Sequence, residues 1–160
     1  MPSLSSFELS LGFMIGGALR GVFVATGVLV VIFPFLSLFP VNFFILFFYI
    51  TMGSITFSLM GILVGVFCKK FDQMSAVNNF FIAPLSFLSG TFYSVSNLPE
   101  PFDIISLFNP VFWLMDGVRF GALGEAESNI FLGCLGIMSV NLILFFTVWK
   151  WFSVGYFLKD

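Results

Sequence analysis

The sequence predicts an all-α membrane protein, a polytopic bundle of four transmembrane helices with short re-entrant or interfacial helices on its outer side. Of its 160 residues, 59% are hydrophobic and 9% are charged, with a mean hydropathy of +1.11. Soluble domains carry about 25% charged residues. The stretch from Gly21 to Cys68 contains no charged residue, and it is too long for one crossing of a ~30 Å hydrocarbon core. These observations predict several spans in one domain, residues 1–160.

The chain begins with a mildly amphipathic segment, residues 2–15. Ser5 and Glu8 have the spacing of a capping box, in which the serine oxygen and the glutamate carboxylate bind free backbone donors at a helix start. The pattern indicates either a local cap alone or a short helix on the membrane surface that contacts a partner. No Lys or Arg precedes Arg20, so the N-terminus lacks the basic region of a secretory signal peptide.

The predicted spans are residues 13–33, 42–67, 75–96 and 130–151. Pro34 and Pro40 supply the break between the first two. Arg20 lies near the inner end of the first span, where its long stem can reach the headgroups. Three small-residue motifs predict close packing of helix backbones: Gly12-x-x-x-Gly16, Gly17-x-x-x-Gly21 and Gly61-x-x-x-Gly65.

The third predicted span contains the polar residues Asn78 and Asn79 together with Pro84. Pro84 deprives the carbonyl of Phe80 of its helical donor, and an uncovered carbonyl in hydrocarbon costs several kcal/mol. This part of the span is therefore expected to face other helices or a cavity. Asn78, Asn79 and Ser89 are candidates for lining a transport pathway, with interhelical hydrogen bonding as the alternative.

Residues 97–129 are too apolar for a loop and predict two outer helices, about 99–107 and 110–122. The 12-residue uncharged run from Ile104 to Met115 suits a re-entrant or interfacial segment better than a crossing. Asn109 followed by Pro110 is typical of a helix start, because the Asn side chain caps and proline loses no bond there.

Asp116 and Arg119 are three residues apart and can pair on the surface of the second outer helix. The pair indicates either a structural contact that fixes the outer helices or a direct contact with substrate. The final span begins at a cap, Ser128 or Asn129, and ends in Trp149-Lys150-Trp151, which is typical of a membrane interface.

The positive residues predict the orientation. Five of the six lie on one side of the predicted spans: Arg20, Lys69, Lys70, Lys150 and Lys159. Only Arg119 lies on the other, so the 68–74 loop and both termini are expected in the cytoplasm. Cys68 and Cys134 then lie near opposite faces, too far apart for a disulfide.

One long segment, FFIAPLSFLSGTFYSVSNLPEPFDIISLFNPVFWLMDGVRFG, resembles the characteristic region of ABC-2 type transporter permeases. The order and spacing of P-L-x-F-L-S-G, L-P, N-P and D-G-x-R carry this resemblance. The start SSFELSLGFMIGGALRG, the KKFDQ loop and the final GYFLKD also match, so the resemblance covers essentially the whole chain.

The resemblance implies a six-span permease that dimerises and is driven by two copies of a separate cytoplasmic ATPase. The four predicted spans would be the family's third to sixth, and the first two would be missing. Residues 2–12, with Ser5, Glu8 and Gly12, would be the coupling segment that faces the ATPase. The outer helices would cap the exit of the pathway, in a region that includes these residues: Pro84, Gly90, Pro99, Asn109, Pro110, Asp116 and Arg119.

We expect the membrane subunit of an exporter in the bacterial inner membrane, surrounded by lipid and carrying a lipid-like, drug or glycan cargo. The chain has no G-x-x-x-x-G-K-[ST] loop, so ATP is expected on the partner, and no catalytic residue, metal or cofactor is expected here. Histidine is absent, and no basic cluster would bind nucleic acid. The alternatives are a non-transporting assembly or scaffold subunit, a non-functional truncated permease, and an intramembrane enzyme, which would need converging ionisable residues inside the membrane.

Overall fold

The computed structural model describes residues 5–36, 39–68, 70–91 and 106–154, and these residues form helices joined by short turns. Three helices are long and apolar enough to cross a membrane: α1 (Ser6–Leu36), α2 (Phe43–Phe67) and α7 (Ile130–Ser153). Three short helical segments follow α2 and form what we call the α3–α4 arm: α3 (Phe71–Val77), the π-helix η1 (Asn78–Ile82) and α4 (Ala83–Phe87). Helix α6 (Pro110–Leu123) precedes α7.

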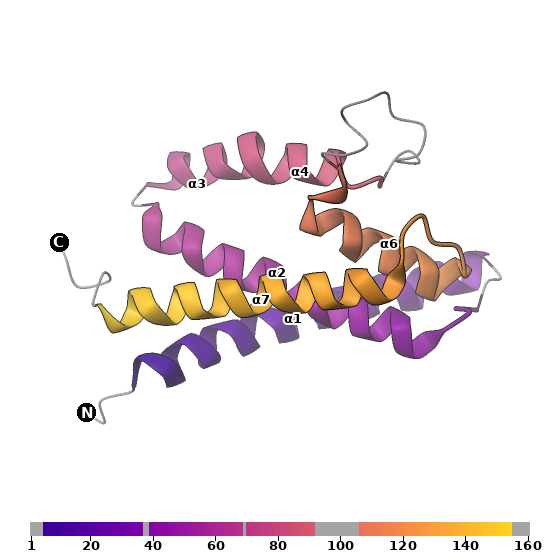
Figure 1. Ribbon diagram of the computed structural model, residues 1–160, viewed down its shortest axis with the longest axis horizontal. Coiled ribbons are helices and arrows are strands. Elements are labelled where there is room, and N and C mark those ends of the chain that lie inside the picture. The colour runs from indigo at the N-terminus through magenta and orange to yellow at the C-terminus, as the bar shows by residue number, and fades with distance from the viewer. Residues whose placement is uncertain (1–4, 37–38, 69, 92–105, 155–160) are drawn as a thin grey trace.

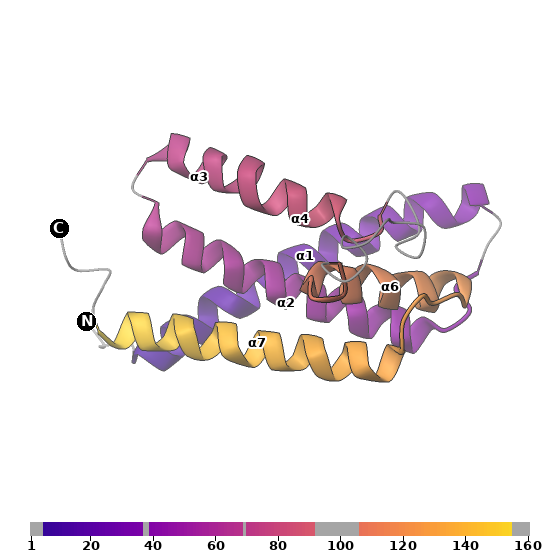
Figure 2. The same cartoon turned by 45° about the horizontal axis from the view of Figure 1, so that its top comes forward.

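The long helices lie side by side, with α6 and the α3–α4 arm on one side of the bundle (Figures 1 and 2). The start of α1, the end of α2 and the end of α7 lie at one end, which we call the α1-start end (Figure 1). The α6–α7 loop lies at the other, the α6–α7 end. Large apolar side chains are exposed along the helices, for example Phe23, Phe44 and Phe131 at 81%, 87% and 70%, as expected for contact with lipid.

The all-helical class is confirmed, whereas the fourth transmembrane helix is not. The predicted spans 13–33, 42–67 and 130–151 coincide with α1, α2 and α7. Helix α1 is longer than expected at both ends, because the capping box starts it at Ser6 and Pro34 lies inside its last turn instead of ending it.

The predicted third span, 75–96, is instead a broken helical arm that ends at Phe87. In the π-helix the N–H of Ala83 reaches back to the carbonyl of Asn78, which widens the turn just before Pro84. After Phe87 the chain turns through Gly90 at φ 73°, a left-handed conformation that favours glycine. The three helical segments of the arm, residues 71–87, together are about 25 Å long at 1.5 Å per residue. Residues 92–96 lie outside the described residues.

One of the three small-residue motifs packs helices together. A Cβ atom built on Gly17 would overlap the side chain of Ser58, and one built on Gly21 would lie 2.6 Å from the Ser54 hydroxyl oxygen. Ser58 also donates a hydrogen bond to the carbonyl of Met14 at 3.0 Å. Helices α1 and α2 therefore cross closely here. The other two motifs were predicted to pack as well, but Cβ atoms built on their glycines meet nothing within 4 Å among the described residues.

The core lies where α2, α6 and α7 meet, around Tyr49, Leu114 and Ile137. A polar contact crosses the bundle near it. The hydroxyl of Thr56 lies 2.8 Å from the side-chain carbonyl of Asn141, and the Asn141 amide donates to the carbonyl of Met52 at 3.3 Å. Both Thr56 and Asn141 are buried, so this contact joins α2 to α7 inside the apolar region.

Candidate functional site

The α6 seat, defined here as α6 with its contacts on α2, α4 and the α6–α7 loop, contains most of the predicted outer residues. Asn109 caps α6 as predicted, since its side-chain oxygen accepts the N–H of Val111 at 3.0 Å. Pro110 occupies the first helical position. The Asn109 amide also donates to the carbonyl of Leu85 at 2.7 Å. Asn109 therefore joins the start of α6 to the last turn of α4.

Two glycines let α6 lie directly against α2. A Cβ atom built on Gly117 would overlap the ring of Tyr49, and one on Gly121 would lie 2.6 Å from the backbone nitrogen of Leu46. The Tyr49 hydroxyl donates to the carbonyl of Ile130 at 2.8 Å. The N–H of Asn42 donates to the Gly121 carbonyl at 2.9 Å. At these two glycines the backbone of α6 therefore packs in direct contact with α2.

Asp116 and Arg119 lie within ion-pair distance, as their spacing predicted, but each has shorter contacts with other groups. Their closest charged atoms are 4.0 Å apart. Asp116 is 1% exposed, and its carboxylate accepts the N–H groups of Glu127 at 2.8 Å and Ser128 at 2.9 Å. The Ser128 hydroxyl donates to the same carboxylate at 2.5 Å. Asp116 therefore holds the α6–α7 loop.

Arg119 joins two other segments. One guanidinium nitrogen donates to Glu127 at 2.7 Å and the other to the carbonyl of Gly90 at 2.6 Å. The turn after α4, helix α6 and the α6–α7 loop are therefore connected through a single side chain. Because Ser128 is bound to Asp116, the cap of α7 is Asn129, whose side chain accepts the N–H of Phe131 at 3.0 Å.

The structure thus brings Gly90, Asp116 and Arg119 together and ties Asn109 and Pro110 to α4, which contains Pro84. Pro99 and the predicted helix 99–107, except for its last two residues, lie outside the described residues. Sequence reasoning missed the contacts of Glu127 and Ser128 with α6. The sequence predicts Ser128 only as a possible helix cap, because its partner, the carboxylate of Asp116, is twelve residues away in the chain.

The three candidate pathway residues do not form one lining. Asn78 and Asn79 are exposed on the π-helix, and Asn78 lines a cavity of about 300 Å³ between the arm and α2, with Gly61, Val64 and others. Ser89 is buried in the turn after α4. Its hydroxyl donates to the Ser86 carbonyl at 2.5 Å and lies 2.7 Å from the Thr91 hydroxyl.

The predicted coupling segment, residues 2–12, is described from Ser5 onward and forms the first turns of α1 rather than a separate helix. Its capping box is present. The Ser5 N–H donates to the Glu8 carboxylate at 2.8 Å, and the Ser5 hydroxyl oxygen accepts the Glu8 N–H at 3.2 Å. Phe7 packs edge-on against Trp149 of α7, with ring centres 6.2 Å apart. Glu8 and Gly12 are exposed.

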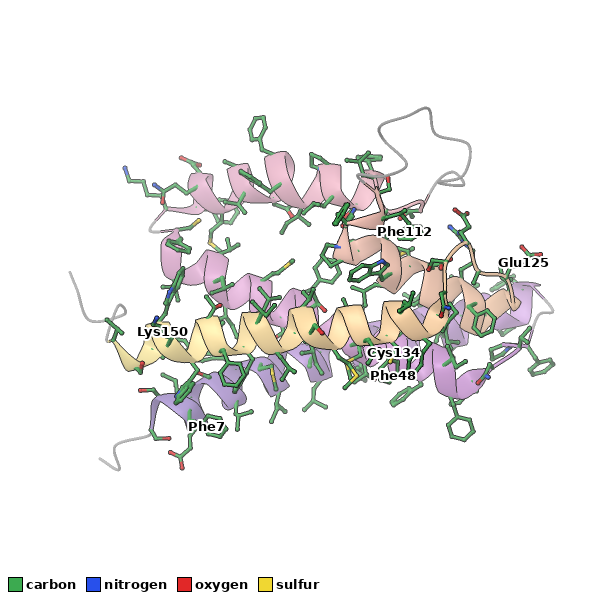
Figure 3. All side chains as sticks on the ribbon, viewed as in Figure 1. Phe7, Phe48, Phe112, Glu125, Cys134 and Lys150 are labelled. Carbon is green, nitrogen blue, oxygen red and sulfur yellow. The ribbon has the colours of Figure 1, made fainter. Side chains whose placement is uncertain are left out.

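The two groups of predicted residues lie at opposite ends of the bundle. Phe7, next to Glu8 in the sequence, and Lys150 lie at the α1-start end, whereas Glu125 lies at the α6–α7 end (Figure 3). The predicted coupling segment and the predicted outer region therefore lie at opposite ends of the bundle.

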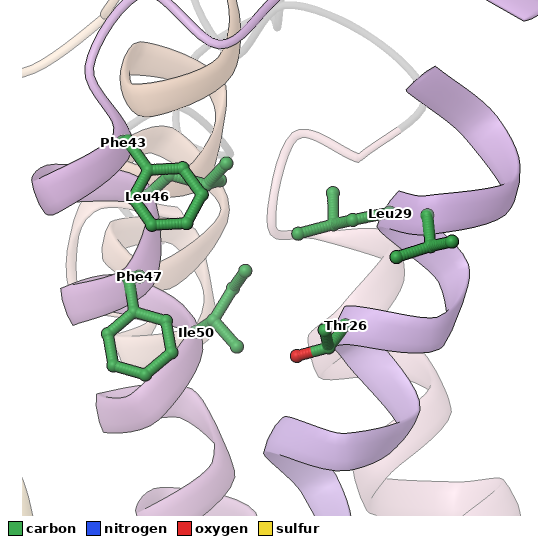
Figure 4. Close-up of a pocket in the computed structure, with 7 residues that line it drawn as sticks. Thr26, Leu29, Phe43, Leu46, Phe47 and Ile50 are labelled. Carbon is green, nitrogen blue, oxygen red and sulfur yellow. The ribbon is translucent and has the colours of Figure 1, made fainter. Parts of the chain in front are cut away.

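Two further cavities are almost wholly apolar. One, of about 270 Å³, lies between α1 and α2 and is lined by Leu29, Phe47, Ile50 and others (Figure 4). Thr26 also lines it, but its hydroxyl donates to the Val22 carbonyl at 2.8 Å. The other, of about 300 Å³, lies between α1, α2 and α7. Neither is lined by a charged side chain, so both suit hydrocarbon rather than polar groups.

Comparison with known proteins identifies similar chains. A family model described as "ABC-2 type transporter" matches residues 1–123. The inner membrane transport permease YadH of Escherichia coli strain K12 is 36% identical over 142 residues, which is 86% of this chain and 53% of the relative. The YadH protein of Shigella flexneri matches to the same extent.

A more distant relative is nodulation protein J of Rhizobium leguminosarum bv. viciae, 27% identical over 99 residues, which is 62% of this chain and 38% of the relative. The chain spans about half the length of the YadH proteins that it matches. No solved structure matches the chain.

Proposed function

Because this chain belongs to the ABC-2 type transporter family, we propose that it forms part of the membrane permease of an ABC exporter. In this proposal a separate ATPase binds the α1-start end and cargo leaves at the α6–α7 end. The observation that carries the proposal is the separation of the exposed Glu8 region from the α6 seat along three apolar helices.

The distribution of charge supports this orientation. Lys70 precedes α3, and Lys150 lies in the last turn of α7, both at the α1-start end. Three of the five described acidic residues, Asp116, Glu125 and Glu127, lie with Arg119 on α6 and the loop after it. Because positive residues are enriched on the cytoplasmic side of inner-membrane proteins, the α1-start end is proposed to face the cytoplasm.

Close helix contacts offer a physical route between the two ends. Helix α1 packs on α2 at Gly17 and Gly21, and α2 packs on α6 at Gly117 and Gly121. Because helices packed this closely cannot move independently, a tilt of α1 would move α2, and α2 would in turn move α6. The permease can respond to the ATPase only if it contacts the two ATPase states differently, and the exposed first turns of α1 are the proposed contact.

The cargo is proposed to be lipid-like. The two apolar cavities have room for hydrocarbon and are lined by no charged side chain. The α3–α4 arm exposes Phe71 and Phe80 at 81% and 77%, and we propose that a second copy of the permease packs there. Asn78 and Asn79, exposed on the same arm, would then line the path between two copies.

The test is to purify the tagged chain with its ATPase and to replace Glu8 by Lys. We expect membrane insertion to persist and stimulation of ATP hydrolysis by the permease to fall to the basal rate. Glu8→Gln retains a capping-box side chain and separates loss of the helix cap from loss of the charge. Glu125→Lys, an exposed change at the opposite end, is the matched control. If no ATPase co-purifies, or if Glu8→Lys retains full stimulation, the proposed contact is wrong.

A further inference from the structure

Arg20 lies deeper in the bundle than its sequence position indicates. It lies between Gly17 and Gly21, and these glycines cross α2 at Ser58 and Ser54. Helix α2 extends from Phe43 to Phe67, so the crossing is at the middle of α2, about 15 to 20 Å from either end at 1.5 Å per residue. Arg20 is therefore near the centre of the span, rather than at its inner end as the sequence predicted.

No described acidic side chain pairs with Arg20. The described carboxylates lie in the first turns of α1 and α3 (Glu8 and Asp72), in the α6–α7 loop (Glu125 and Glu127), and in the middle of α6 (Asp116, which is 1% exposed). Glu8 is more than three turns away on α1, and Asp116 is fully engaged with the α6–α7 loop. A second copy in the same orientation has the same distribution, and its Asp116 is likewise buried and bound to its own loop, so its described residues could not offer an accessible carboxylate at this depth either.

The helix face around Arg20 is open. Gly16, one turn before it, is on the same side of α1, and Gly12 is one turn further. Cβ atoms built on either glycine meet no atom within 4 Å, so the Arg20 side chain does not cover Gly16. Arg20 itself and Phe23, which follows it by three residues, are exposed. The small residues permit another helix backbone to approach, directly beside the charge.

From the depth of this charge, its lack of an acidic partner and the open face beside it, we infer that Arg20 docks a transmembrane helix from outside the described residues. That helix carries an Asp or Glu near its middle. Ionisable side chains within spans pair with one another or with backbone because an isolated charge in hydrocarbon is costly. The inference does not depend on the cargo or the direction of transport.

The experiment is photocrosslinking in intact cells with benzoyl-phenylalanine in place of Phe23, an aromatic side chain that is 81% exposed. Benzoyl-phenylalanine in place of Phe131 on α7, 70% exposed, is the control. We expect the Phe23 probe to capture a peptide within an apolar stretch of about 20 residues that contains an Asp or Glu. Arg20→Gln should lower the yield about tenfold, and Arg20→Lys should retain most of it.

A charge exchange completes the test. Arg20→Glu combined with replacement of the captured acid by Arg should restore the yield, whereas each change alone should not. Resistance of each variant to alkaline extraction from membranes verifies its insertion. The inference is overturned if the Phe23 probe captures phospholipid or nothing, if the captured helix has no acid, or if the inserted Arg20→Gln protein retains the full yield.

Discussion

Replacing Gly117 by alanine places a methyl group where the ring of Tyr49 lies. The built Cβ atom overlaps three ring atoms of Tyr49. The ring has little freedom to move, because Tyr49 is 2% exposed and its hydroxyl is bound to the Ile130 carbonyl. Overpacking of this kind costs about 1 to 3 kcal/mol, while removing a helical glycine returns about 0.5 to 1 kcal/mol. The expected net loss in the free energy of unfolding is therefore about 0 to 2.5 kcal/mol.

The assay is thermal or denaturant unfolding in detergent micelles, with Gly65→Ala as the matched control. A Cβ atom built on Gly65 meets nothing within 4 Å, so that change should stabilise the protein by about 0.5 to 1 kcal/mol. In the Gly117→Ala background, Tyr49→Ala removes all three overlapping atoms and should make the two changes non-additive by about 1 kcal/mol or more. Equal effects of Gly117→Ala and Gly65→Ala, or simple additivity of Gly117→Ala with Tyr49→Ala, would refute the close packing of α6 on α2.

Three further predictions concern the other contacts. Asp116→Ala leaves the N–H groups of Glu127 and Ser128 without their acceptor and should destabilise the protein by about 3 kcal/mol. The control, Glu125→Ala at an exposed position, should change stability by less than about 0.5 kcal/mol. Equal effects would contradict the conclusion that Asp116 holds the α6–α7 loop. Arg119→Met removes the hydrogen bonds to Gly90 and Glu127 and should speed proteolysis after α4 and in the α6–α7 loop at least severalfold. An unchanged cleavage rate would contradict the conclusion that Arg119 connects these two segments. Thr56→Val removes the hydroxyl beside Asn141 and should cost about 0.6 to 1.7 kcal/mol in micelles, so a neutral result would mean that this contact does not join α2 to α7.

The features that the sequence predicted correctly depend on neighbouring residues. The capping box at Ser5 and Glu8 and the cap at Asn109 are local hydrogen bonds, readable from spacing alone. The apolar runs that became α1, α2 and α7 have the length that a bilayer requires. The start of α6 was correct for the same local reason, since proline at its first position fixes the backbone.

The features that the sequence did not predict depend on contacts between distant segments. The carboxylate of Asp116 is bound to residues 127 and 128 as well as lying 4.0 Å from Arg119, and spacing along one helix cannot reveal the bonds to the loop. The third span was expected to reach residue 96, but the π-helix and the turn at Gly90 end its arm at Phe87. The three glycine motifs look alike in sequence, and only the fold determines that Gly17 and Gly21 face Ser58 and Ser54.

The central claim is that the Glu8 region and the α6–α7 loop lie on opposite sides of the membrane, the first in the cytoplasm. Its direct test is labelling of single cysteines, at Glu8 or at Glu125, with a membrane-impermeant thiol reagent in sealed vesicles of known orientation. Both native cysteines, Cys68 and Cys134, are first replaced by serine. The account predicts that Glu125→Cys is labelled only from the outer side and Glu8→Cys only from the cytoplasmic side. Labelling of both positions from the same side would contradict it.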